Sequence, residues 1–216
     1  MCLGVQRGVM SDESSAAPVT AELPDSPFHT TGTDHVTLIG SNEEDTIEFY
    51  RDLLGMPLVL RQPNLDDPNS THLFFDSGDG RIVTFFVTDD RQSNSAPLRH
   101  QVGSVHHLAF SVDPGEFERI KQALEHDGFG YNEFDRGIFH SLYTRDHNGL
   151  TIELATDKYD VPDGRRGEVL AATQRHRVRD GAEFAEAEHL EAALDELGLD
   201  ADPVELPDAP TGAGVE

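Results

Sequence analysis

The stretch DHVTLIG (residues 34–40) has a counterpart in HHLAFSV (106–112), and the repeat that begins there decides the fold. Apolar residues alternate with other residues in both stretches, as they do in a strand with one buried face. An amphipathic segment follows each stretch, EEDTIEFYRDLLG (43–55) in the first copy and PGEFERIKQALEHDG (114–128) in the second. The chain therefore contains an internal duplication.

Each copy reads as strand, helix, strand, strand, strand. Apolar residues recur at helical spacing in the two amphipathic segments, and Gly55 and Gly128 supply their left-handed ends. Asp113 is suited to cap the second helix. The other predicted strands cover 56–61, 72–80, 81–87, 130–134, 140–149 and 150–156. This pattern predicts an α+β fold of two βαβββ modules, which we expect to pair into an open, eight-stranded, barrel-like sheet.

The segments outside the duplication lack its dense pattern. Polar and acidic composition predicts disorder near both ends, because too little apolar surface is available for burial. The predicted divisions are a flexible acidic tail (1–31), one domain (32–160) made of module one (32–90) and module two (104–158), an extension with one helix (161–198) and a disordered acidic tail (199–216). Whether residues 1–9, which precede Met10, belong to the native protein stays open.

Composition excludes several classes of function. The chain has 41 Asp and Glu against 16 Lys and Arg, so its net charge of -25 disfavours binding to nucleic acids and to anionic membranes. No stretch is apolar over the roughly 20 residues that a membrane-spanning helix needs. Cys2 is the single cysteine, so an intrachain disulfide cannot form. With no secretory signal at the N-terminus, we expect a cytoplasmic protein.

The cations are also unusual, because Lys occurs only at 121 and 158 and Arg supplies the others. Molar salt shortens the screening length to a few ångströms, so like charges then repel weakly. An acidic, lysine-poor chain is typical of proteins from a salt-saturated cytoplasm, and we expect a halophilic source.

Side-chain alternation places one candidate metal ligand on the polar face of each of three strands. These are His35 and His107 on the first strands of the two copies and Glu153 on the last strand of the second. A histidine alone on a strand is more often structural, but a carboxylate on an interior strand face is costly unless a cation offsets it. If the two copies pack around a shared cup, two imidazoles and a carboxylate form the triad that leaves open positions on non-haem Fe(II).

The motifs that carry these residues resemble a known family. GTDHVTL (32–38), VHHLAF (105–110) and NGLTIELATD (148–157) are similar to the metal strands of the vicinal oxygen chelate superfamily, which includes glyoxalases, bleomycin resistance proteins and extradiol dioxygenases. The segment DRGIFHSLYTRDHNGLTIELATD (135–157) resembles hydroquinone-type ring-cleaving dioxygenases. The resemblance implies that His35, His107 and Glu153 bind a metal, with Tyr143 and Arg136 near the substrate.

Four further residues are candidates to line the cup or to support the ligands: Asp34, His106, His72 and His140. Asp34 stands where the family often has a second histidine, and the resembling dioxygenases usually have more modules. A glyoxalase-type lyase normally adds a fourth ligand, a glutamate in copy one that matches Glu153. Alignment of the hairpins puts Phe85 or, one residue away, Thr84 at that position, and neither is a carboxylate.

The resemblance implies an Fe(II)-dependent extradiol-type dioxygenase that uses O2 to cleave a small dihydroxylated aromatic ring, a hydroquinone or a catechol. Mn, Zn or Ni are the alternative metals, and a homodimer is compatible with the sequence. Two other functions stay open. One is a glyoxalase-like, metal-dependent lyase or isomerase, and the other is a metal-free protein that binds a small molecule, as bleomycin resistance proteins do.

The charge generates the first prediction. Because the net charge is -25, molar KCl should screen self-repulsion and raise the melting temperature steeply above its value in dilute buffer. Thermal unfolding followed by circular dichroism over a KCl series measures this. Equal melting temperatures throughout the series would remove the inference of a halophilic source.

Overall fold

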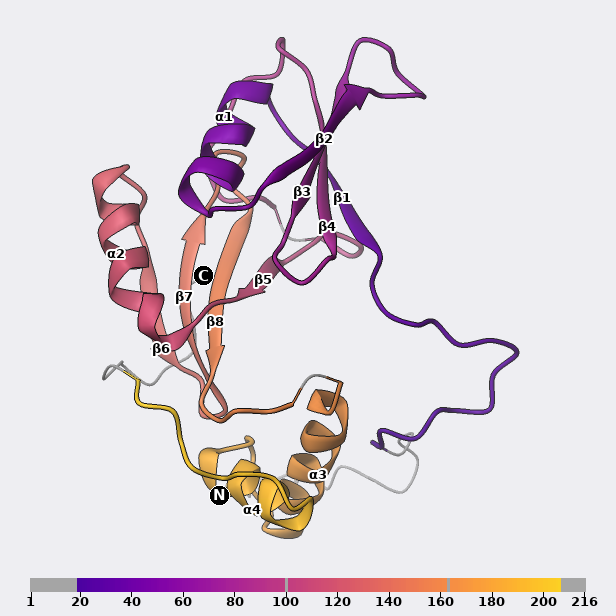
Figure 1. Cartoon of the computed structure of the whole chain (residues 1–216), viewed down its shortest axis with the longest axis vertical. Coiled ribbons are helices and arrows are strands. Elements are labelled where there is room, and N and C mark those ends of the chain that lie inside the picture. The colour runs from indigo at the N-terminus through magenta and orange to yellow at the C-terminus, as the bar shows by residue number, and fades with distance from the viewer. Residues whose placement is uncertain (1–18, 100, 163, 207–216) are drawn as a thin grey trace, which may run out of the picture.

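The computed structural model describes residues 19–99, 101–162 and 164–206, and it contains two four-stranded sheets. The strand orders are β1-β4-β3-β2 and β5-β8-β7-β6 (Figure 1). The strands are β1 (His35–Ile39), β2 (Leu58–Pro63), β3 (Thr71–Asp76), β4 (Ile82–Val87), β5 (His107–Ser111), β6 (Asn132–Asp135), β7 (Phe139–Arg145) and β8 (Thr151–Asp157). The predicted α+β fold of two βαβββ modules is confirmed, with the eight strands divided between two open sheets.

The two sheets have the same pairing scheme. The first strand of each module pairs in parallel with the last, β1 with β4 and β5 with β8, and the other pairs are antiparallel. Thr84 lies opposite Thr37 in module one, as Glu153 lies opposite Ala109 in module two. Thr84, rather than Phe85, is therefore the counterpart of Glu153, and module one has no carboxylate at this position.

Local sequence explains the helices. The first begins after Asn42, whose side chain accepts a hydrogen bond from the Asp45 amide, and it runs through α1 (Glu43–Ile47) into a π-helical turn, η2 (Glu48–Leu53). The second begins with the short 3-10 segment η3 (Pro114–Glu116) and continues as α2 (Phe117–His126). Asp113 caps it as predicted, by accepting from the Gly115 amide. Gly55 and Gly128 follow the helices with φ of 72° and 78°, as predicted.

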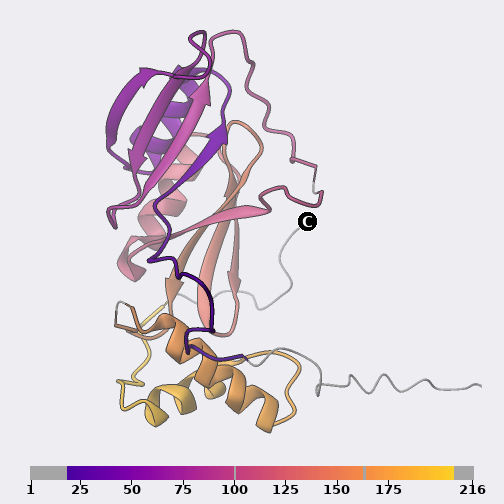
Figure 2. The same ribbon diagram turned by 90° about the vertical axis from the view of Figure 1, so that its right-hand side faces the viewer.

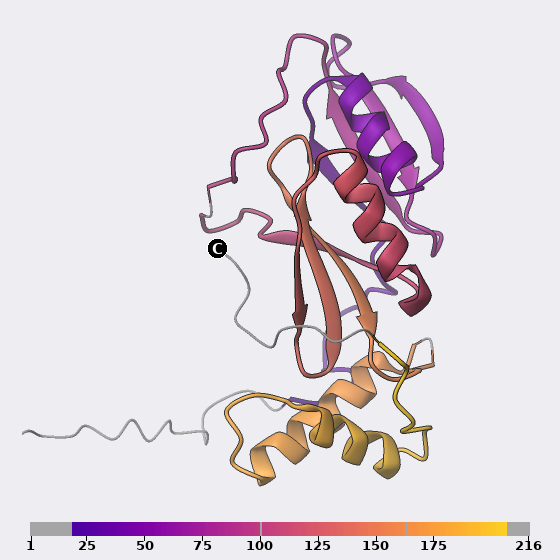
Figure 3. The same cartoon turned by 90° about the vertical axis from the view of Figure 1, so that its left-hand side faces the viewer.

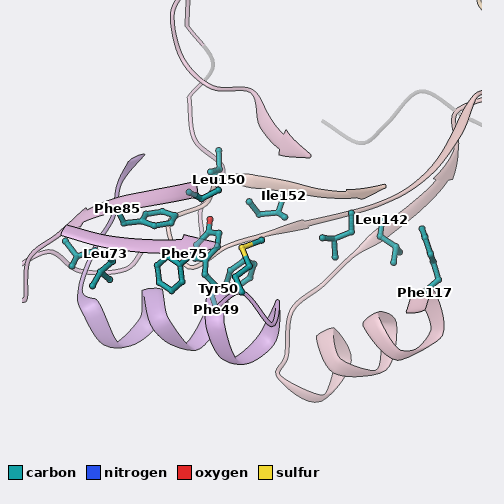
Figure 4. Close-up of a cluster of buried hydrophobic side chains, with 13 residues drawn as sticks. Phe49, Tyr50, Leu73, Phe75, Phe85, Phe117, Leu142, Leu150 and Ile152 are labelled. Carbon is teal, nitrogen blue, oxygen red and sulfur yellow. The ribbon is translucent and has the colours of Figure 1, made fainter. Parts of the chain in front are cut away.

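One hydrophobic core joins the modules. Both helices lie on the same side of the two sheets (Figure 3), and side chains from both modules fill the space between helices and strands (Figure 4). Phe49 and Tyr50 from η2 belong to the same cluster as Leu150 and Ile152 from the β7–β8 region. The opposite faces of both sheets are therefore not covered by these helices.

Two helices, rather than the single one predicted, follow the second module. They are α3 (Arg166–Arg179) and α4 (Ala187–Glu196), at the bottom of Figure 1. The prediction missed α3 because its buried stripe consists largely of small or polar residues. A second cluster holds the two helices together, with Tyr159, Val169, Leu190 and Leu194 at its centre.

The predicted tails fall partly outside the described residues, which exclude 1–18 and 207–216. Residues 19–31 are exposed and form no helix or strand. The prediction of disorder from 199 onward is wrong for 199–206, because Leu199 and Ala201 pack on the second cluster and Pro203 bridges to Tyr159. Over the described ranges, no helix combines the length and apolar character needed to cross a bilayer.

The segment between β4 and β5 passes over the β7–β8 turn (Figure 2). The Asn94 amide donates to the His147 carbonyl at 2.9 Å, which fixes this crossing. Gly149 lies beneath it with φ of +79°, and a Cβ at this position would lie 2.0 Å from the Ala96 carbonyl oxygen. The turn therefore needs glycine both for its backbone conformation and for the close approach of the two chain segments.

A change of Gly149 to Ala tests this crossing. The left-handed conformation and the backbone contact together should destabilise the fold by about 2–4 kcal/mol. Chemical denaturation at a fixed KCl concentration measures the loss.

Gly80→Ala is the matched control, because Gly80 has nearly the same φ, +78°, but nothing within 4 Å of the added Cβ. Its cost should be only the left-handed strain, about 1 kcal/mol. Equal losses in the two variants would contradict the role given to the contact with Ala96.

Candidate metal centre

His107 and Glu153 meet on the open face of module two. They come from the neighbouring strands β5 and β8, and His107 Nε2 lies 3.0 Å from Glu153 Oε2. The Glu153 side chain is only 5% exposed, whereas that of His107 is 37% exposed. A buried carboxylate thus faces an accessible imidazole, and both atoms belong to types that bind transition metals.

Two hydroxyl groups hold the other oxygen of this carboxylate. Ser141 Oγ and Tyr143 OH donate to Glu153 Oε1 at 2.6 and 2.8 Å. Burial, and next the hydrogen bond to Glu153, raise the pKa of Tyr143, and the nearby Arg136 acts in the opposite direction. The phenol therefore keeps its proton at neutral pH. The hydroxyl groups of Ser141 and Tyr143 fix the orientation of the Glu153 carboxylate and leave its Oε2 facing His107.

Arg136 lies over aromatic rings next to Tyr143. Its guanidinium carbon is 4.7 Å from the ring centre of Phe134 and 5.0 Å from that of Tyr143. A cation over two rings is held by their quadrupoles. Arg136 and Tyr143 are therefore neighbours, and the arrangement brings positive charge to the edge of the open face.

His106 supports His107 on the side away from Glu153. The two Nδ1 atoms are 2.7 Å apart, so one imidazole donates to the other. If His107 donates its Nδ1 hydrogen, its Nε2 keeps a free lone pair for a metal. His106 is therefore placed to select the tautomer that ligation requires.

The corresponding face of module one contains His35 and Asp34. The His35 Nδ1 lies 2.6 Å from the Asp34 carboxylate, and both side chains are exposed. A carboxylate only accepts hydrogen bonds, so Nδ1 carries a hydrogen, and in the neutral imidazole the lone pair is then on Nε2. Asp34 consequently orients His35 as a carboxylate orients a metal-binding histidine.

His72 lies on the same open face, among aromatic rings. Its ring centre is 4.0 Å from that of Phe74 and 4.4 Å from that of Phe86. Its Nε2 is 2.9 Å from the Thr84 hydroxyl, which donates to Thr37 at 2.8 Å. Desolvation, and next the proximity of His35, lower the pKa of His72. A neutral histidine between two phenylalanines thus lines this half of the predicted cup.

The structure of one chain brings together only two of the three predicted ligands. Within the part of the chain that the structure describes, no group of three or more His, Cys, Asp or Glu side chains is placed to hold one metal ion. His107 and Glu153 contact each other, whereas the nearest interactions of His35 are with Asp34 and His72. Each module therefore presents one part of the predicted ligand set.

His140 is not on the open face, where it was predicted to line the cup. It is 2% exposed, stacks edge-on against Phe117 of α2 and lies 2.8 Å from Glu133. The prediction paired His140 with His72 through an offset of 68 residues. The register shows that Ser141 matches His72, and a shift of one residue on a strand moves a side chain to the other face.

Ser141 is the site residue that the sequence analysis did not single out. It is fully buried and makes the shorter of the two hydroxyl contacts to Glu153. Alternation along the strand could have found it, because Ser141 lies two residues before Tyr143 and must share its face.

Comparison with known proteins identifies the family of the chain. Residues 32–154 match the model of the Glyoxalase/Bleomycin resistance protein/Dioxygenase superfamily. This match covers more than half of the chain and includes both modules. The chain belongs to this superfamily, as the resemblance of its metal strands implied.

The curated relatives carry two kinds of name. The "Putative ring-cleaving dioxygenase MhqE" of Bacillus subtilis is 34% identical over 107 residues, which are 48% of this chain and 34% of that protein. The similarly named MhqO is 30% identical over 131 residues, 58% of this chain and 40% of MhqO. The metallothiol transferase FosB of Staphylococcus haemolyticus is 27% identical over 128 residues, 58% of this chain and 83% of FosB. The chain thus spans well under half the length of these dioxygenase relatives.

A solved structure supports the same relationship. The crystal structure of a dioxygenase named as putative, from Bacillus subtilis, aligns with a TM-score of 0.52 at 27% identity. The alignment covers 60% of this chain and 42% of that one.

Proposed function

We propose that the protein is a metal-dependent dioxygenase that cleaves a dihydroxylated aromatic ring, with Fe(II) held by His107 and Glu153 of one chain and His35 of a second copy. The observation that carries the proposal is the buried Glu153 carboxylate against His107 Nε2. The names of the relatives MhqE and MhqO support the reaction type.

The residues fit a divalent metal. Glu153 is buried on a strand face, and among the described residues its polar contacts there are two neutral hydroxyl groups and an imidazole. Burial of a carboxylate is costly unless a cation offsets its charge. Two imidazoles and one carboxylate also leave coordination positions free for substrate. Mn, Zn or Ni would suit the same nitrogen and oxygen donors.

A second copy supplies the missing ligand in this proposal. The core that joins the modules lies on their helical side, and the faces that carry His35 and His107 are exposed. Contact between module one of one copy and module two of another would cover both faces at once. Twofold symmetry would then create two identical sites per dimer, each with residues from both chains.

When bound, the metal would supply a Lewis acid for the diol and a redox centre for oxygen. The chain supplies orientation and protons. Tyr143, whose raised pKa keeps its proton on the phenol oxygen, would act as a general acid or donate to a developing oxyanion by turning its hydroxyl away from Glu153 Oε1, which Ser141 also contacts. Arg136 adds positive charge beside it. In the dimer, Phe74 and Phe86 would form the aromatic wall against which a substrate ring packs.

A redox-neutral metal enzyme is the second candidate. The match to FosB favours it, because that match covers 83% of the FosB length, whereas the dioxygenases are much longer than this chain. Thr84 favours the dioxygenase over a glyoxalase-type site, since it leaves module one without a fourth ligand. Oxygen uptake separates the two candidates.

Replacement of Tyr143 by Phe tests the reaction. The variant should keep iron and substrate binding but turn over about 100-fold more slowly, the usual range for a positioned acid or base. Oxygen consumption by the iron-loaded protein with a panel of hydroquinones and catechols measures this.

Tyr159→Phe is the control, because its hydroxyl contacts Glu191 of the C-terminal helices, away from the open face. It should turn over at the wild-type rate. Equal rates for Tyr143→Phe and wild type would remove Tyr143 from the chemistry. Absence of uptake with every member of the panel, together with activity under argon, would favour the redox-neutral enzyme.

The shared site makes a separate prediction for metal binding. His35→Ala and Glu153→Ala should each abolish iron binding, yet co-expression of the two variants should restore about a quarter of the wild-type iron per chain. Random pairing makes about half of the dimers mixed, and one of the two sites in each mixed dimer is intact. Iron analysis of anaerobically purified protein measures the recovery.

Co-expression of His107→Ala with Glu153→Ala is the matched control. Both residues belong to the same half of the site, so no pairing restores it. Recovery in this control, or none in the first mixture, would contradict a site shared between chains. Full iron in Glu153→Ala alone would contradict the ligand assignment itself.

A further inference from the structure

Arg145 lies on the open face of module two, in the same row as His107. It pairs with Thr151 across β7 and β8, and Thr151 pairs with His107 across β8 and β5. Neighbouring strands are about 4.8 Å apart, so the backbones of Arg145 and His107 are about 10 Å apart. Tyr143 precedes Arg145 by two residues and shares its face. The long side chain of Arg145 can therefore reach one end of a small molecule whose other end lies at His107.

Arg145 as a residue is half-buried, and it has no charged partner in the part of the chain that the structure describes. Among residues 19–99, 101–162 and 164–206, no carboxylate or other acceptor is recorded within hydrogen-bonding distance of it. Surface arginines of this acidic chain pair readily, as Arg61 does with Glu43 at 2.6 Å. A partly desolvated cation without a partner is unfavourable. Although the chain has 41 acidic residues, none of those described forms an ion pair with Arg145.

A cavity adjoins this guanidinium. It has a volume of about 400 Å³ and is lined by Arg145 and Tyr143 together with Asn132, Thr151 and the loop 128–131. Cavities of a few hundred cubic ångströms bind small organic ligands. The polar groups of Asn132 and Thr151 are neutral, so Arg145 supplies the only full charge on the lining of this cavity.

We propose that Arg145 binds a carboxylate of the substrate, so that the preferred substrates are aromatic diols that bear a carboxylate group. Arginine presents paired N–H groups in a plane, which match the two oxygens of a carboxylate. Identification of the molecule as a diol rests on the proposed function above. Recognition of the carboxylate rests only on the position, burial and charge of Arg145.

The test compares two ligands of similar size, benzoate and phenol, by isothermal titration calorimetry at one KCl concentration. The wild-type protein should bind benzoate more tightly than phenol. Arg145→Gln should weaken benzoate binding by about 10- to 100-fold, the range expected for loss of a charge-assisted contact. Phenol binding should change less than about twofold. Arg145→Lys keeps the charge without the paired geometry and should give an intermediate affinity for benzoate.

Arg119→Gln is the control, because Arg119 pairs with Glu116 on α2 and lies outside this cavity. It should bind both ligands as the wild type does. Unchanged benzoate binding in Arg145→Gln would overturn the inference, including the case in which the carboxylate binds a metal ion instead. A wild type that does not distinguish benzoate from phenol would also overturn it.

The two proposals fail in different ways. Binding of benzoate that depends on Arg145, without oxygen uptake on any diol, would support the anion site and reject the dioxygenase. Oxygen uptake with neutral hydroquinones, together with benzoate binding that is unchanged in Arg145→Gln, would support the dioxygenase and reject the anion site.

Discussion

The hydroxyl of Tyr50 donates to the carboxylate of Asp146 at 3.0 Å, where the helix of module one meets the β7–β8 turn of module two. Both groups are buried, and the apolar cluster around them draws on both modules. The helix-covered faces of both sheets are buried in one core. Only the opposite face of each sheet is therefore available for a binding site. The candidate ligands His35, His107 and Glu153 lie on those other faces.

Much of the fold was predictable because its signals are local. Alternation at a period of two and helical spacing of apolar residues can be read within a dozen positions, and the duplication made each signal appear twice. The helix α3 was missed for a physical reason. Its buried stripe includes Ala171, Ala172 and Thr173, which give little contrast with an exposed surface. The packing of Leu199 and Ala201 was missed because isolated apolar residues in an acidic segment carry no periodic signal.

The candidate site was predictable only within a module. His107 and Glu153 come from adjacent strands, so alternation alone was enough to put them on one face. The pairing register between neighbouring strands cannot be determined from the alternation of side chains alone. The hairpin alignment put Phe85 opposite Glu153 in the repeat, with Thr84 reached only by a shift of one residue, and it assigned His140 to the wrong face through the same error of one residue. The position of His35 relative to His107 depends on how whole modules pack, which no short pattern encodes.

The two modules carry different side chains at matched positions of the repeat. Thr84 occupies the place of Glu153, Phe74 that of Tyr143 and His72 that of Ser141, so the two copies have the same backbone but different chemical contents. At these three positions module two carries a carboxylate and two hydroxyl groups, whereas module one carries a threonine, a phenylalanine and a histidine. In the proposed site, where the faces of the two modules meet, this difference leaves one carboxylate from these matched positions. Two copies of module two in the same arrangement would place two carboxylates there, and two copies of module one would place none.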